Sequence, residues 1–222
     1  MSGTNHWAGR AKRRAARRIG ARWSHPGYWH LGRAADSYLR RHGNDDNNLD
    51  QNGEAHVLRL LDLAPGSTVF DVGCHAGDWT ALIKRTYPGI RVEAFEPTAD
   101  LVAVLRERFA YEPDVSIHPV ALGDANGTAA FFVDADGSSM NSLVERPQVG
   151  EGSLTRTEVE VRRGDDLVDE LRIDRIAYLK VDVEGNDLSV LRGLRSTLAS
   201  GTVTALQFEY NRFSIYSRSL LL

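Results

Sequence analysis

Three charged side chains occupy alternate positions at the end of an apolar run: Lys180, Asp182 and Glu184 in YLKVDVEG, residues 178–185. If this run is a buried strand, its alternate residues share one face, so the three charges point the same way. A carboxylate in that position can accept the proton of an attacking hydroxyl or orient the hydroxyl. We take Asp182 as the first candidate for this role and Glu184 as the second. The alternative is an ion network with Lys180 that only caps the strand.

A glycine-rich turn, Gly73 to Gly77, follows another apolar run that ends on Asp71. Such a turn before a helix lets a backbone approach a ligand closely and is typical of nucleotide and S-adenosylmethionine sites. A dinucleotide site requires G-x-G-x-x-G, but His75 and Asp78 stand where its second and third glycines would be. Both side chains disfavour a diphosphate. Asp71 suits a cationic amino group, so the pattern favours S-adenosylmethionine over NAD.

Two further acids end apolar runs. Glu96 closes the run from Ile90 to Phe95, and its carboxylate is suited to accept hydrogen bonds from both ribose hydroxyls. Glu209 follows a later run and adds a carboxylate that, with Asp182, suits the substrate or a divalent cation. Since neither a histidine nor a tight acidic spacing accompanies these acids, we expect no metal.

Four sequence blocks in this order and spacing resemble the FkbM family of methyltransferases: DVGCHAGDWT (71–80), AFEP (94–97), PVALGD (119–124) and LKVDVEGND (179–187), followed by QFEYN (207–211). The resemblance covers about residues 54–211. It implies a Rossmann-like class I methyltransferase fold and S-adenosylmethionine as the cofactor. It also implies O-methylation of a hydroxyl on a sugar or polyketide-type natural product.

The resemblance also assigns roles to residues. The methyl donor is expected to lie against the turn, the acid of the second strand and the segment near adenine: Asp71, Gly73, Cys74, His75, Gly77, Glu96, Pro97, Leu122, Gly123 and Asp124. For the acceptor we expect Glu209 and, from a Ser-rich loop at 138–142, Ser139 and Asn141. A plain surface loop is the alternative reading of that segment.

Two other functions remain open at this point. A non-catalytic module that binds S-adenosylmethionine is the alternative from a different class. It is motivated by the thirteen residues left after Glu209, where related enzymes usually continue with a helix and an antiparallel hairpin of about 30 residues. That hairpin is expected to be missing or truncated, which leaves an open sheet edge where a second copy could pair. An NAD-linked oxidoreductase is disfavoured by the residues that replace the glycines.

The elements that must position these residues alternate between helix and strand. Apolar periodicity predicts helices at 53–63, 77–87, 101–109, 164–171 and 186–199, and strands at 67–72, 90–95, 115–120, 128–133, 157–162, 176–181 and 203–208. Residues 134–152 are expected to form a long loop. Alternating strands and helices predict a mostly parallel sheet with helices on both faces.

Charge is distributed unevenly along the chain. Residues 1–42 contain ten Lys or Arg and one acid, whereas the other 180 residues contain 17 basic and 29 acidic side chains. We therefore expect a basic N-terminal extension, partly helical or disordered, at residues 1–50 and the methyltransferase domain at 51–222. Anionic lipid, nucleic acid and a transit peptide are possible roles for the extension. Without a nucleic-acid motif we expect a solvated arm and no nucleic-acid partner.

Composition limits the setting of the chain. With 222 residues and 42% hydrophobic residues, it fits one globular domain. Its single cysteine excludes an internal disulfide and favours the reducing cytoplasm. No apolar run approaches the roughly 20 residues of a membrane-spanning helix, and no secretory signal is recognisable. The expected partner is a small-molecule hydroxyl acceptor.

Overall fold

The computed structural model describes Leu49, residues 53–134, Ser142, Leu143 and residues 154–209. The chain divides into two units, Met1–Leu60 and Leu61–Leu222. In the first unit the described helix is α3 (Glu54–Leu60), which was predicted at 53–63. The basic extension lies almost entirely outside the described residues, so its boundary at residue 50 stays a prediction.

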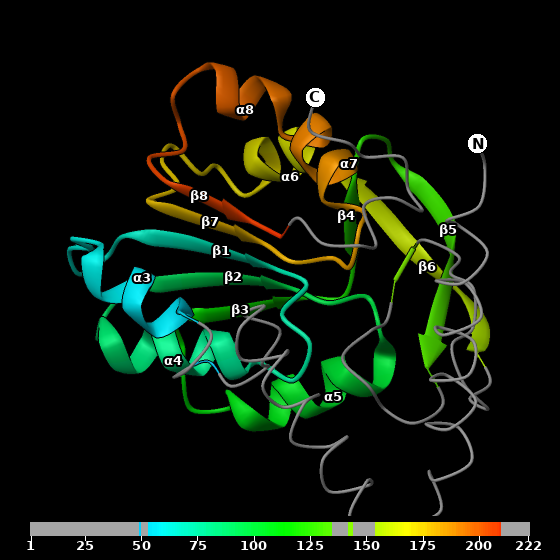
Figure 1. The fold of residues 1–222 in the computed structure, drawn as a ribbon, viewed down its shortest axis with the longest axis horizontal. Helices are drawn as coiled ribbons and strands as arrows, with labels where there is room; N and C mark the ends of the chain where they lie inside the picture. Colours follow the sequence, from blue (N-terminus) through cyan, green and yellow to red (C-terminus); the bar gives the residue numbers. More distant parts are fainter. Residues whose placement is uncertain (1–48, 50–52, 135–141, 144–153, 210–222) are drawn as a thin grey trace, which may run out of the picture. The chain divides into compact units, whose positions relative to one another are not determined.

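The second unit contains a five-stranded sheet in the order β3-β2-β1-β7-β8, in which every neighbouring pair is parallel (Figure 1). Its strands are β1 (Thr68–Val72), β2 (Arg91–Phe95), β3 (Val115–His118), β7 (Tyr178–Val181) and β8 (Leu206–Phe208). Because all five strands run the same way, their carboxyl ends meet at one edge. This sheet confirms the predicted class I Rossmann-like fold.

Helices cover both faces of this sheet. Phe70, Leu179 and Val181 share a buried cluster with residues of α6 (Gly164–Glu170) and α7 (Asp187–Gly193). On the opposite face Trp79 of α4 (Asp78–Thr86) stacks on Tyr178, with ring centroids 5.9 Å apart. The helix α5 (Ala99–Arg108) follows β2. Side chains alternate along each strand, so the apolar runs supply both cores.

A second, three-stranded sheet has the order β4-β6-β5. Its strands are β4 (Ala121–Gly123), β5 (Gly127–Asp134) and β6 (Leu154–Arg163), with β5 antiparallel and β4 parallel to β6. The sequence analysis assigned no strand to residues 121–124, because three residues are too few to show an alternating pattern. Only the pairing with β6 makes this segment a strand.

The predicted helix at 186–199 is two helices, α7 and α8 (Arg195–Ala199), which meet at Leu194. At the end of α7, a Cβ on Gly193 would lie 1.9 Å from the carbonyl oxygen of Gly123. The helix therefore contacts β4 backbone to backbone, a packing that no periodicity reveals. Residues 210–222, where the sequence analysis discussed a truncated hairpin, lie outside the described residues. Within the described part, no helix has the length and apolar character to cross a membrane.

Candidate active site

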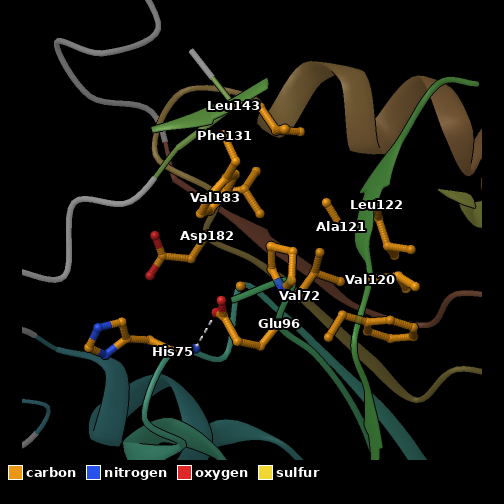
Figure 2. A pocket seen from close by; sticks show the side chains of 13 residues that line it. Val72, His75, Glu96, Val120, Ala121, Leu122, Phe131, Leu143, Asp182 and Val183 are labelled. Atoms are coloured by element: carbon orange, nitrogen blue, oxygen red, sulfur yellow. Dashed lines mark hydrogen bonds between the residues drawn. The ribbon is translucent and has the colours of Figure 1, made fainter. Parts of the chain in front are cut away.

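A pocket lies at the carboxyl ends of the central strands, the place where open parallel sheets bind their ligands. Its walls come from the glycine turn, the end of β2, β4, and the segment after β7 (Figure 2). The lining residues are Val72, Gly73, His75, Phe95, Glu96, Pro97, Val120, Ala121, Leu122, Phe131, Leu143, Asp182 and Val183. The parallel sheet thus brings together segments that are 110 residues apart in sequence.

The two glycines of the turn are required by the packing of the protein itself. Gly73 and Gly77 both have φ of +82°, a region that favours glycine. A Cβ on Gly73 would lie 1.9 Å from the carbonyl oxygen of Asp182, and a Cβ on Gly77 would lie 2.6 Å from the ring of Phe109. The space that the sequence analysis reserved for a ligand is occupied by these neighbours. Gly73 still contributes backbone to the pocket, whereas Gly77 does not line it.

Glu96 is held in the pocket by backbone hydrogen bonds. Its Oε1 accepts from the amide of Thr98 at 2.9 Å, and its Oε2 accepts from the amide of His75 at 3.2 Å. Burial raises the pKa of Glu96, and the two hydrogen bonds oppose this rise. Each carboxylate oxygen has a second lone pair. The carboxylate can therefore still accept hydrogen bonds from a ribose.

The pocket has a polar and an apolar side. Figure 2 shows the side chains of His75, Glu96 and Asp182 opposite Ala121 and Leu122. Other apolar residues of the lining are Phe95, Pro97, Val120 and Phe131. Such a lining fits a ligand with a flat, weakly polar group at one end and hydroxyl and cationic groups at the other, which are the features of S-adenosylmethionine.

Besides Gly77 and Asp71, three residues predicted to bind the cofactor do not line this pocket: Cys74, Gly123 and Asp124. Cys74 is buried in the turn, where burial raises the pKa of its thiol well above the usual value. Gly123 is buried against Val161 of β6, and Asp124 is exposed, with its amide donating to Ser189 Oγ at 3.2 Å. For these three residues the structure offers a packing or surface role.

Asp71 also lies outside the pocket lining. It has no exposed surface, and its Oδ2 accepts a hydrogen bond of 2.6 Å from Thr80 Oγ1 of α4. Its Oδ1 lies 4.0 Å from the ammonium of Lys180. The cation next to Asp71 is therefore a lysine of the neighbouring strand, where the sequence analysis expected the amino group of a ligand.

Three carboxylates that follow β7 and β8 lie close together. Asp182 lines the pocket and accepts a hydrogen bond of 2.9 Å from Lys180 Nζ. One carboxylate oxygen from each of Asp182, Glu184 and Glu209 lies within 4.8 Å of the other two. Acidic groups of this kind are common without a cation, so the expectation of no metal stays a prediction. Asp182 and Glu209 follow the last residues of β7 and β8, which are neighbours in the sheet.

The turn that carries Glu184 is held from two sides. Glu184 has a φ of +54°, and its carbonyl oxygen accepts a hydrogen bond of 2.9 Å from the buried hydroxyl of Ser142. From the other side, buried Asp187 accepts from the amides of Gly185 at 3.2 Å and Glu209 at 3.3 Å. Asp187 thus links the turn after β7 to the residue after β8.

Ser139 and Asn141, the predicted substrate contacts of the 138–142 loop, lie outside the described residues. The structure adds residues that the sequence analysis did not single out. Phe131 and Leu143 line the pocket, and Thr80 and Asp187 support its acids. Thr80 and Asp187 stand inside the quoted blocks DVGCHAGDWT and LKVDVEGND, which were a usable signal. Phe131 and Leu143 carried none, because only the tertiary fold brings them to the site.

Asp78 at the start of α4 is paired with Arg108 of α5, whose Nη1 lies 2.7 Å from Asp78 Oδ1 and 2.6 Å from the carbonyl oxygen of Ala76. The carboxylate that we expected to repel a diphosphate therefore has a cationic partner at the surface. The stronger obstacle to a dinucleotide is His75, which stands at the position of the second glycine.

Comparisons with known proteins agree with the site. The sequence profile described as "Methyltransferase FkbM domain" matches residues 71–219. Methyltransferase 1 of Beauveria bassiana is 29% identical over 161 residues, which cover 64% of this chain and 65% of that protein. The 2-O-methyltransferase NoeI of Sinorhizobium fredii is 26% identical over 169 residues, 71% of this chain and 67% of NoeI.

A third relative is the 31-O-demethyl-FK506 methyltransferase FkbM of Streptomyces tacrolimicus, 29% identical over 170 residues, 60% of this chain and 62% of that protein. The chain thus matches about two thirds or less of the length of these relatives. The profile, however, matches well over half of the chain and starts at Asp71. S-adenosylmethionine is the cofactor that the family and the pocket share. The chain therefore belongs to the FkbM methyltransferase domain family.

Proposed function

We propose that this chain transfers a methyl group from S-adenosylmethionine to a hydroxyl oxygen of a sugar or polyketide-type natural product. The observation that carries the proposal is the position of Asp182. Asp182 lines the pocket, and one carboxylate oxygen from each of Glu184 and Glu209 lies within 4.8 Å of one of its own. The names of NoeI and FkbM, which describe methylation of an oxygen, support the same reaction.

The donor would be held by residues from three strand ends. Glu96 would accept hydrogen bonds from the ribose, and Phe95, Ala121 and Leu122 would enclose the adenine. The backbone at Gly73 and His75 would face the methionine part of the molecule. When bound, S-adenosylmethionine supplies an electrophilic methyl group on a cationic sulfur.

Asp182 would accept the hydrogen bond of the acceptor hydroxyl and take its proton as the oxygen attacks. Methyl transfer needs the attacking oxygen in line with the bond that breaks, so orientation contributes as much as basicity. Glu184 and Glu209 would hold other hydroxyl groups of the acceptor. Apolar Phe131 and Leu143 would contact its carbon skeleton.

A transfer experiment with labelled donor tests the proposal. The protein is incubated with methyl-deuterated S-adenosylmethionine and a panel of monosaccharides, oligosaccharides and macrolides, and products are identified by mass spectrometry. We expect one deuterated methyl group on an oxygen of a sugar or macrolide. Asp182→Asn should lower kcat by about 10²–10⁴-fold, the range for loss of a general base.

The exposed Asp174, which lies between α6 and β7, supplies the matched control variant Asp174→Asn and should leave the rate unchanged. Label found only on nitrogen or sulfur would contradict O-methylation. Full activity of Asp182→Asn would contradict the role of Asp182. Binding of S-adenosylhomocysteine without product from any acceptor would favour the non-catalytic module.

A further inference from the structure

The ammonium of Lys180 is buried between two carboxylates of different strands. Its side chain is 6% exposed, and Nζ lies 2.9 Å from Asp182 Oδ2 and 4.0 Å from Asp71 Oδ1. The register of the parallel sheet explains this arrangement, because Asp71 of β1 is the direct partner of Lys180 on β7. Asp182, two residues further along the chain, returns to the same side.

Helix α4 fixes Asp71, the carboxylate of this cluster that lies outside the pocket. Asp71 is fully buried and receives a hydrogen bond of 2.6 Å from Thr80 Oγ1. Burial raises the pKa of Asp71, while the Lys180 charge and the Thr80 hydroxyl act in the opposite direction. The ring of Trp79, the residue before Thr80, lies 5.8 Å from the Lys180 ammonium and covers it from the helix side. Helix α4 therefore holds both Asp71 and Lys180.

These contacts form a continuous chain from Thr80 through Asp71 and Lys180 to Asp182. Of its four members, only Asp182 reaches the pocket. Carboxylate partners hold a buried ammonium in one position, because the loss of either partner leaves an uncompensated buried charge. The position of the Lys180 ammonium, and with it the carboxylate of Asp182, is therefore set by groups on the side of the sheet that carries α4.

We propose that Lys180 and Thr80 are positioning residues: Thr80 orients Asp71, Asp71 holds the Lys180 ammonium, and Lys180 fixes the Asp182 carboxylate at the pocket wall. The inference rests on the proposed function for the importance of Asp182. It makes Asp71 part of these internal contacts, so that Asp71 does not bind the amino group of the donor. It also gives Thr80 a part in the reaction without any contact to donor or acceptor.

The contacts from Thr80 to Asp182 can be observed directly and without turnover, because the protein contains few lysines. The protein has three lysines, Lys12, Lys84 and Lys180. In protein labelled with ¹⁵N-lysine, ¹H–¹⁵N spectra detect ammonium groups that are buried and hydrogen-bonded. Lys180 should give such a signal, and Lys84, with a side chain 10% exposed and Nζ 2.5 Å from Asp114 Oδ2, provides the internal reference. Lys180→Arg and Lys84→Arg assign the two signals.

We expect Asp182→Asn and Thr80→Val each to shift the Lys180 ammonium signal by more than its linewidth and to leave the Lys84 signal in place. Thr86→Val is the matched control, since Thr86 belongs to the same helix and its hydroxyl bonds to Leu82 of its own turn. A Lys180 signal that stays unchanged in Thr80→Val would overturn the role of Thr80. A Lys180 signal that stays unchanged in Asp182→Asn would overturn the whole proposal. Neither result depends on whether a hydroxyl acceptor exists.

Kinetics then separate positioning from donor binding. With an acceptor from the transfer experiment, Thr80→Val should lower kcat about tenfold, as expected for a displaced catalytic group, and leave the calorimetric Kd for S-adenosylhomocysteine within a factor of about two. Thr80→Ser, which keeps the hydroxyl, should restore kcat. Equal losses in kcat and in affinity would overturn the proposal and return Asp71 to the donor site. Failure of Thr80→Ser to restore kcat would also count against it.

Discussion

The carbonyl oxygen of Asp182 lies 1.9 Å from the point where a Cβ on Gly73 would stand. The turn after β1 and the segment after β7 are therefore in backbone contact. Because the neighbour is a backbone atom, no side-chain rotation can relieve a clash there.

Gly73→Ala should accordingly destabilise the fold by more than the about 1–2 kcal/mol that a left-handed φ alone costs an alanine. Gly201→Ala is the control, because Gly201 has a φ of +76° and no atom within 4 Å of its virtual Cβ. Thermal unfolding of both variants measures the difference. Equal losses of stability would show that the contact with Asp182 does not constrain residue 73.

His75 has a φ of +50° although it is not a glycine. Asparagine tolerates this region, whereas a β-branched side chain does not. His75→Asn should stay within about 0.5 kcal/mol of the wild type, and His75→Val should lose about 1–3 kcal/mol, the range for such strained positions. Denaturant unfolding of the two variants checks the order. A His75→Val protein as stable as His75→Asn would mean that the turn adopts another conformation.

Glu96→Gln should weaken binding of S-adenosylhomocysteine by about tenfold or more, because hydrogen bonds to a charged acceptor contribute about 1.5–3 kcal/mol. Calorimetry gives the affinity. Glu93→Gln is the control, since Glu93 is a similarly buried acid within β2 that pairs with His118 at 2.7 Å and does not line the pocket. Unchanged affinity in Glu96→Gln would exclude Glu96 from the ribose site.

Asp187 makes stability depend on pH. Burial, with the Asp182 charge as the second cause, raises the pKa of Asp187 from 3.8 to about 6 in the folded protein. The folded state therefore binds this proton more tightly than the unfolded chain, so the group contributes more stability as the pH falls from about 7 to about 4. At neutral pH the ionised carboxylate costs on the order of 3 kcal/mol, about 1.4 kcal/mol for each pKa unit.

The measurement is the Tm of wild type and Asp187→Asn between pH 4 and pH 7. Asparagine has no proton to gain, so the Tm of the wild type should rise relative to that of the variant as the pH is lowered. A constant difference in Tm across this range would contradict the raised pKa. Asp174→Asn, an exposed change, should follow the wild type.

Much of the site could be predicted because its residues are local to strand ends. Gly73, Glu96 and Asp182 each stand within two residues of the end of an apolar run, and a parallel sheet brings such ends together. The short strand β4 and the break at Leu194 could not be predicted. β4 is a strand because it pairs with β6, and Gly193, next to the break, packs against the backbone of Gly123. Contacts between residues so far apart in sequence leave no local pattern.

By itself, the sequence determined the order of strands and helices, the turn that follows β1 and the acids that face the crevice. These are properties of periodicity and residue type. Only the tertiary structure decided how two similar acids differ. Asp71 is enclosed by α4 and by Lys180 of the adjacent strand, whereas Asp182 stands beyond the last residue of β7 and reaches the pocket. Burial is set by what packs against a residue, and that is known only once the chain has folded.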